Sequence, residues 1–234
     1  MKTQILKKSI ILVLINVLLL SSVYSANEEY SKTLHKEYKA DKNTLLVVEN
    51  KYGEVNINNW DKNQIFIDVE ITVEESKQEE AKELLKYITV NFSKEGNTIK
   101  AITNIDSKFF KGSLFSFGNN AKEFSIDYEI KTPKNINLNL ENKYGDAFIN
   151  EISGHVKLRI KYGNIRINKL ERGNTKPLNN LYLAYSNATI DDVNWLKTEV
   201  SYSKIEIEKS QALVAITKYS KMYFTKVSTL ACES

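Results

Sequence analysis

Six stretches of the chain share one pattern of apolar and polar positions, each centred on a tyrosine. With the tyrosine as position zero, mostly apolar residues recur at −6, −4 and −2, and again at +3 and +5. Alternation with a period of two is typical of a β-strand with one buried face. The pattern therefore predicts a strand on each side of every one of these tyrosines: Tyr52, Tyr144, Tyr162, Tyr185, Tyr202 and Tyr219.

The spacing of the tyrosines is close to regular. The last five are separated by 18, 23, 17 and 17 residues, and the longest interval contains a loop of turn-forming residues at about 172–177. A fixed period of this size indicates one structural unit that stacks along an axis, with equivalent residues about 4.8 Å apart. We predict an all-β fold, a single-stranded parallel β-solenoid (β-helix) with coils of about 17 residues.

The residue after each tyrosine is glycine or serine. Small residues suit a corner because they tolerate unusual dihedral angles and the close approach of neighbouring coils. The tyrosines have the same parity as inward-facing residues such as Leu140 and Leu183. We therefore predict that their rings pack inward with the hydroxyl at the corner. The alternative is an exposed aromatic stripe that stacks on sugar rings.

Between Trp60 and Pro133 the repeat is absent. Alternating residues predict a strand at 65–73, Ser76 and Glu79 predict a capping box at the start of a helix that runs to about 88, and a hairpin turns at 95–97. A last strand is predicted at 124–130. These elements indicate a small α+β insert that caps one end of the solenoid, which gives a division into residues 26–135, the first coil plus the cap, and residues 136–234, the solenoid repeats.

The first 25 residues have the features of a secretory signal peptide. Lys2, Lys7 and Lys8 precede an apolar run at 10–20, and cleavage is predicted before Ala26. An uncleaved anchor is the alternative, although the run is short for a membrane span. Loss of three lysines leaves 30 basic against 29 acidic residues, so a nucleic-acid partner is not expected. After cleavage no transmembrane span is predicted.

Few residues have the types and spacing that a catalytic or metal-binding site needs. The adjacent carboxylates Asp191 and Asp192 could serve a glycan-active enzyme as acid and base, but they occupy a turn position that is polar in every copy. His35 and His155 lack partners at metal-ligand spacing, and Cys232 has an inward register. We predict no catalytic, cofactor-binding or metal-binding residues and no cofactor. One aromatic segment is a possible contact loop, or else part of the core of the cap: Phe109, Phe110, Phe115 and Phe117.

The repeated phrase Asn-Lys-Tyr-Gly-Asp/Glu-x-x-Ile, the signal peptide and the strand–helix–hairpin insert together resemble a Bacteroidota family of "putative adhesins" with β-strand repeats, a domain of unknown function. The resemblance covers residues 40 to 230 and implies an exported, non-enzymatic envelope protein that binds a macromolecule or glycan at the cell surface. It would lie in the periplasm, on the outer-membrane surface or outside the cell. A periplasmic structural or signalling accessory without an adhesive role is the alternative.

Overall fold

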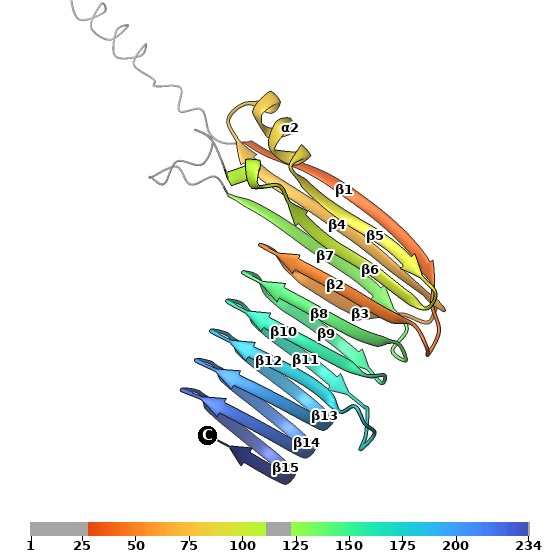
Figure 1. The fold of residues 1–234 in the computed structure, drawn as a ribbon, viewed down its shortest axis with the longest axis vertical. Coiled ribbons are helices and arrows are strands. Elements are labelled where there is room, and N and C mark those ends of the chain that lie inside the picture. Colours follow the sequence, from red (N-terminus) through yellow and green to blue (C-terminus); the bar gives the residue numbers. More distant parts are fainter. Residues whose placement is uncertain (1–27, 111–122, 234) are drawn as a thin grey trace, which may run out of the picture.

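The computed structural model describes residues 28–110 and 123–233 (Figure 1). Their strands form one sheet of 15 strands, in which parallel and antiparallel pairs are combined. The all-β class is as predicted, but the sheet as a whole is mixed rather than parallel. The strands are β1 Glu28–Lys39, β2 Leu45–Lys51, β3 Val55–Asn59, β4 Gln64–Glu75, β5 Ile88–Glu95, β6 Thr98–Ile105, β7 Phe124–Thr132, β8 Asn137–Lys143, β9 Ala147–Ile152, β10 Val156–Lys161, β11 Asn164–Leu170, β12 Asn179–Ala184, β13 Asn187–Ser201, β14 Lys204–Lys218 and β15 Lys221–Glu233.

The parallel part of the sheet follows the sequence repeat. Leu140 of β8 lies beside Leu158 of β10, and Leu158 lies beside Leu181 of β12, which are 18 and 23 residues apart along the chain. From β13 to β15 each residue lies beside one 17 residues further on, as in the pair Ala215 and Cys232. The spacing of the tyrosines therefore gives the register of the parallel strands.

The parallel strands form two faces that enclose a narrow core. One face consists of β2, β8, β10 and β12 and the second halves of β13 to β15, and the other of β3, β9, β11 and the first halves of those strands. Equivalent residues of successive coils meet in the core, as Ile149, Ile167 and Ile190 do, each no more than 1 % exposed. Burial of these aliphatic rows is the main force that holds the coils together.

Residues 28–39, 64–110 and 123–132 form the end of the molecule next to the first coil (Figure 1). Strands β1, β4 and β7 are antiparallel and extend one face through β3, whereas β6 extends the other face through β2 and forms a hairpin with β5. The helix α2, Gln78–Lys86, buries Ala81, Leu84 and Leu85 and contacts β4, β1 and β5. The predicted strands, helix and hairpin are present.

The predicted capping box is wrong. Helix α2 begins after Lys77, which makes no side-chain capping bond. Ser76 instead donates both its backbone N–H and its hydroxyl to the buried carboxylate of Glu75, and Glu79 pairs with Lys82 at 2.8 Å. The carboxylate at the end of β4 competes for the hydroxyl that the helix would need.

Three further predictions concern the ends of the chain and the contact loop. The signal peptide lies outside the described residues, and so do Phe115 and Phe117. No helix of the part that the structure describes is long and apolar enough to cross a membrane. Cys232 has the predicted inward register, since it lies beside the buried Ala215, but as part of β15, the last described strand, it is exposed.

Candidate functional site

The corner between the two faces turns at the tyrosine itself. All six repeat tyrosines have positive φ values, between +50° and +62°, and they are the only non-glycine residues of the described chain that do. Their amides still continue the hydrogen bonding between coils, since Tyr144 donates to the carbonyl oxygen of Lys161 at 3.0 Å and Tyr202 to that of Lys218 at 2.9 Å. A left-handed residue therefore makes the bend without interrupting the sheet.

The prediction that the tyrosines pack inward is wrong. Tyr144, Tyr162, Tyr185 and Tyr202 are each between 45 % and 52 % exposed, and Tyr219 is 76 % exposed. The alternation of a strand places position zero on the inner side only while the backbone stays extended. The left-handed conformation reverses the direction of the side chain, so the ring points outward from the corner.

The exposed rings form a continuous column. Successive ring centroids lie 5.0 to 5.1 Å apart, and the planes of neighbouring rings differ by 1° to 11° except at the last pair, where they differ by 27°. Each ring from Tyr144 to Tyr202 therefore has a neighbouring ring against both faces and leaves mainly its edge and hydroxyl in water, whereas Tyr219 is covered on one face. We call this row of six residues the tyrosine column.

The glycines after the first three tyrosines serve close approach rather than unusual dihedral angles, since none of them has a positive φ. A Cβ on Gly53, Gly145 or Gly163 would lie 2.0 to 2.1 Å from a carbonyl oxygen of the preceding layer. No side chain fits at that distance. At these three glycines the backbone of the preceding layer therefore lies where a Cβ would be.

Serine takes the same position in the last three coils and joins them by its hydroxyl. The amide of Ser186 donates to Ser203 Oγ at 3.1 Å, and the amide of Ser203 donates to Ser220 Oγ at 3.2 Å. Each hydroxyl in turn donates to the carbonyl oxygen two residues earlier, as from Ser203 to Ser201 at 2.7 Å. The corner has two forms, and the tyrosine is common to both.

Buried amides support the glycine form of the corner. Asn142 is fully buried, and its Nδ2 donates to the carbonyl oxygens of Gly53 at 3.1 Å, Gly145 at 2.9 Å and Asp146 at 3.0 Å. Asn50 occupies the equivalent place one layer earlier and donates to Ile126 at 2.8 Å. These bonds satisfy carbonyl groups that the sharp turn removes from the strand ladder.

The charge beside the column changes along its length. At the position two residues after the tyrosine, the first coils carry Glu54 and Asp146, the middle coils asparagine, and the last coils Lys204 and Lys221. Asp146 accepts hydrogen bonds from the backbone and side chain of Asn164, and Lys204 pairs with Glu206. A partner that lies along the column would meet an acidic end and a basic end.

Aromatic residues continue the column at its N-terminal end. The ring of Tyr52 lies 5.0 Å from Phe124 and 6.2 Å from Phe110, one of the residues of the predicted contact loop. Phe109 is only 2 % exposed, whereas Phe110, the last residue of the short 3₁₀-helix Ser107–Phe110, is 41 % exposed. Of this loop's described residues, one is part of the core and the other lies at the surface near the column.

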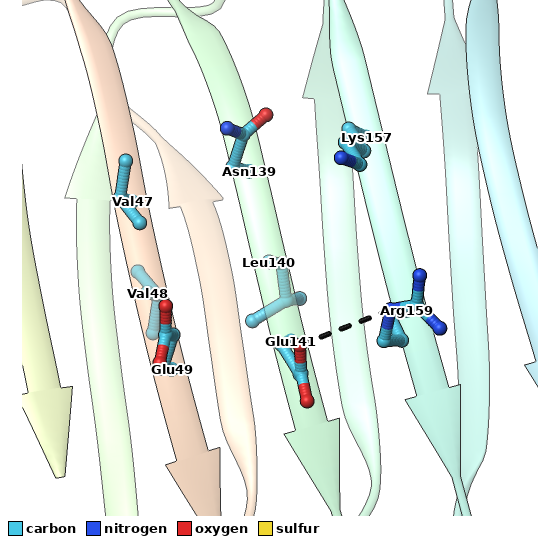
Figure 2. Close-up of a pocket in the computed structure, with 8 residues that line it drawn as sticks. All are labelled: Val47, Val48, Glu49, Asn139, Leu140, Glu141, Lys157 and Arg159. Atoms are coloured by element: carbon cyan, nitrogen blue, oxygen red, sulfur yellow. Dashed lines mark ion pairs between the residues drawn. The ribbon is translucent and has the colours of Figure 1, made fainter.

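A shallow hollow of about 150 Å³ lies on the outer face between β2, β8 and β10 (Figure 2). Val48 and Leu140 form its floor, and the ion pair between Arg159 Nε and Glu141, 3.8 Å apart, lies at its rim. Glu141 also pairs with Lys143 at 2.7 Å. The hollow is too small for more than a few atoms of a ligand, so it is a surface depression rather than a pocket.

The carboxylates considered for catalysis are engaged in ion pairs between coils. Asp191 accepts from Arg166 at 2.8 Å, and Asp192 pairs with Lys209 at 3.2 Å. Within residues 28–110 and 123–233, no group of three or more His, Cys, Asp or Glu side chains could hold a metal ion. His35 lies on β1 and contacts Asp68 at 2.8 Å.

Comparison with known proteins identifies no family for the chain. No protein-family model matches it. No curated protein matches it either.

Solved structures with a similar course of the chain do exist. A "putative cell adhesion protein" from Clostridium sporogenes has a TM-score of 0.40 at 10 % identity, over 88 % of this chain and 100 % of that one. A "putative adhesin" from Bacteroides fragilis has 0.32 at 13 %, over 86 % and 97 %. A "putative lipid binding protein" from Parabacteroides distasonis has 0.29 at 14 %, over 87 % and 97 %. Identities at this level do not indicate a shared ligand.

The contribution of the stack to stability can be measured by comparing two positions of the column. Tyr162 stacks on two rings and Tyr219 on one, while both have the same left-handed backbone. Asparagine tolerates this conformation, so Asn at either place relieves the same strain. We expect Tyr162→Asn to lower the free energy of unfolding by about 1 kcal/mol more than Tyr219→Asn, the worth of one aromatic contact. Urea unfolding of both variants measures the difference, and equal effects would contradict it.

Proposed function

We propose that this chain is an exported, non-enzymatic, adhesin-like protein of the bacterial envelope, and that the tyrosine column is the surface by which it contacts its partner. One observation carries the proposal. The tyrosine is unchanged in six copies and exposed in the last five, while the residue after it changes from glycine to serine and the residue at +4 ranges from Asn56 to Phe148 to Arg166.

Aromatic contacts alone do not account for tyrosine at these corners. A left-handed residue other than glycine or asparagine costs about 1–2 kcal/mol, and one aromatic contact per coil contributes about 0.5–1.5 kcal/mol beyond the burial of the ring. The contact and the strain are therefore of similar size. Backbone strain of this kind is typical of functional surfaces, where it directs a side chain toward a ligand.

The geometry of the column selects the kind of contact. Sugar-binding aromatic residues stack a ring face on the sugar, but here the faces are covered by neighbouring rings. The exposed edges present hydroxyl groups at the spacing of the coils. Such a row suits an extended polymer that runs parallel to the column and hydrogen-bonds to several hydroxyl groups, either a glycan chain or another macromolecule of the cell surface.

The architecture and family belong to the same proposal. We propose that the parallel coils are a single-stranded β-solenoid over residues 136–234, that residues 26–135 form the first coil and a cap, and that residues 1–25 direct export. The parallel register at intervals of 17 to 23 residues and the antiparallel end formed by β1, β4 and β7 support this division. The chain would then be a member of the adhesin-like family that its repeated phrase resembles.

The location is tested by protease shaving of intact cells, with lysed cells as the control. We expect mass spectrometry to detect peptides of the parallel coils, such as 205–209, after treatment of intact cells. Release only after lysis would place the protein inside the envelope, and the adhesive role would then be abandoned in favour of a periplasmic structural or signalling role.

The role of the column is tested by removing hydroxyl groups without removing rings. The triple variant Tyr144→Phe, Tyr162→Phe and Tyr185→Phe keeps the stack and the fold. We expect binding to surface glycans and matrix proteins on an array to fall at least about tenfold, since several hydrogen bonds of about 0.5–1.5 kcal/mol each are lost. Tyr182→Phe, on the outer face away from the column, is the control. Unchanged binding by the triple variant would refute the proposal.

A further inference from the structure

One loop breaks the regularity of the coils and is attached to the outer face. Residues 171–178 connect β11 to β12 and lengthen this coil to 23 residues. His155 Nε2 lies 3.0 Å from the carbonyl oxygen of Leu178, and Arg172 Nε donates to that of Pro177 at 3.2 Å. Two side chains therefore hold the loop in place over the start of β10 and β12.

A hollow of about 610 Å³ lies between this loop and the sheet. Pro177, Leu178, the ring of His155 and the aliphatic parts of three lysine side chains line it, so its surface is almost wholly apolar. The lysines come from three separate segments: Lys157 from β10, Lys176 from the loop and Lys197 from β13. The volume is sufficient for one sugar ring with its substituents.

The lysines around the hollow are largely without counter-charges. Lys157 and Lys197 each lie beside Asn180 in the parallel register, so they are two strands apart, or about 10 Å. No ion pair of the described residues involves Lys157 or Lys176, and Lys197 pairs only with Glu199, at 3.5 Å. Neighbouring cations around the hollow that lack carboxylate partners raise the local potential for an anion.

The histidine of the hollow is a tether rather than a fourth cation. Burial lowers the pKa of His155, and the nearby charges of Arg172 and Lys157 lower it further, although the bond to the Leu178 carbonyl opposes them. His155 is therefore neutral at neutral pH, with the proton on Nε2 when it donates to Leu178. The positive charge of the hollow comes from the lysines.

We propose that this hollow binds the carboxylate-bearing ring of an acidic glycan. The carboxylate would lie at the edge of the hollow, within reach of the ammonium groups of Lys157, Lys176 and Lys197, and the apolar face of the sugar would lie against Pro177 and Leu178. An inorganic anion would use only the charges and leave the apolar walls uncovered, which is why a charged ring fits the hollow better.

The site is separate from the tyrosine column. Lys157 lies on β10, and Tyr162 lies five residues further along the chain, at the corner just after that strand. Five residues of extended chain span about 16 Å. The acidic-glycan site therefore does not depend on the contact proposed for the column, and the variants that test the two surfaces share no residue.

The experiment measures binding of trigalacturonate to the full exported chain by calorimetry at low salt. The fully methyl-esterified trisaccharide has the same rings without the charges. We expect trigalacturonate to bind at least about tenfold more tightly than its ester, and the double variant Lys157→Gln and Lys197→Gln to weaken it about tenfold or more. The control, Lys82→Gln with Lys226→Gln, removes the same net charge elsewhere and is expected to bind as the wild type does.

The outcomes distinguish a specific sugar site from a general attraction of the chain for anions. Weakened binding in the Lys157 and Lys197 variant alone supports the site. Equal weakening in the control variant would show a response to net charge and overturn it, and so would absence of trigalacturonate binding. Inorganic phosphate, or vesicles with anionic lipid, that compete at equal or lower concentration would assign the hollow to another anion and overturn the sugar assignment.

Discussion

Replacement of Gly145 by alanine is expected to lower the free energy of unfolding by about 3 kcal/mol, because a rigid backbone collision has to be relieved. The added Cβ would lie 2.0 Å from the carbonyl oxygen of Gly53 and 2.6 Å from its carbon. Neither atom can move without separating the coils, and separation also disturbs the aliphatic rows beneath. Chemical denaturation followed by circular dichroism measures the loss.

Gly173 provides the matched control for this prediction. It lies in the 171–178 loop, and a Cβ there would meet nothing within 4 Å. We expect Gly173→Ala to change the free energy of unfolding by less than about 0.5 kcal/mol in either direction. If Gly145→Ala is tolerated as well as Gly173→Ala is, the close approach of the coils at this corner is not a requirement of the fold.

Replacement of Asn142 by alanine is expected to cost about 3 kcal/mol as well, for a different reason. The Nδ2 group donates to three carbonyl oxygens of the corner. Loss of the amide leaves these acceptors without their donor, and each unsatisfied group costs about 1–3 kcal/mol. Asn142 is itself fully buried, so its truncation also leaves a cavity at the corner.

The control is Asn139→Ala, on the outer side of the same strand, β8. It removes the same chemical group from a partly exposed position, so we expect an effect below about 0.5 kcal/mol in the same denaturation experiment. A comparable loss for both variants would mean that the amide of Asn142 contributes no more than a surface amide does, contrary to the hydrogen bonds at the corner.

The strands and their register follow from local patterns. The alternation of apolar residues places Ile65, Ile67 and Val69 on one side of β4. The interval between tyrosines predicts the parallel pairing of β10 with β12 and of β13 with β14. These predictions succeed because burial of one face selects the register, and a shift by one residue would expose every apolar side chain.

The direction of the tyrosine rings did not follow from the pattern. Parity predicts a side chain only while the backbone is extended, and the corner is the one place where it is not. The sequence assigns the unusual conformation to Gly145, but it is Tyr144 that has the positive φ. Glycine is needed there because the backbone of the neighbouring coil lies where a Cβ would be, and this arrangement is a property of the stack.

The hollow proposed to bind an acidic glycan likewise could not be recognised from the sequence alone. Lys157, Lys176 and Lys197 are far apart in a sequence with no net basic character once residues 1–25 are set aside, so they give no signal as a group. They border one hollow because β10 and β13 are two strands apart and because His155 holds the loop beside them.

The sequence by itself determined the all-β class, the strands, the spacing of the coils and the elements of the non-repeating end, because each depends on which face of a strand or helix is apolar. The tertiary structure decided that the tyrosines are a surface and not a core, and that three distant lysines border one hollow. Both depend on the distance between coils and on the backbone conformation at their corners, which are set by contacts among residues that are remote along the chain.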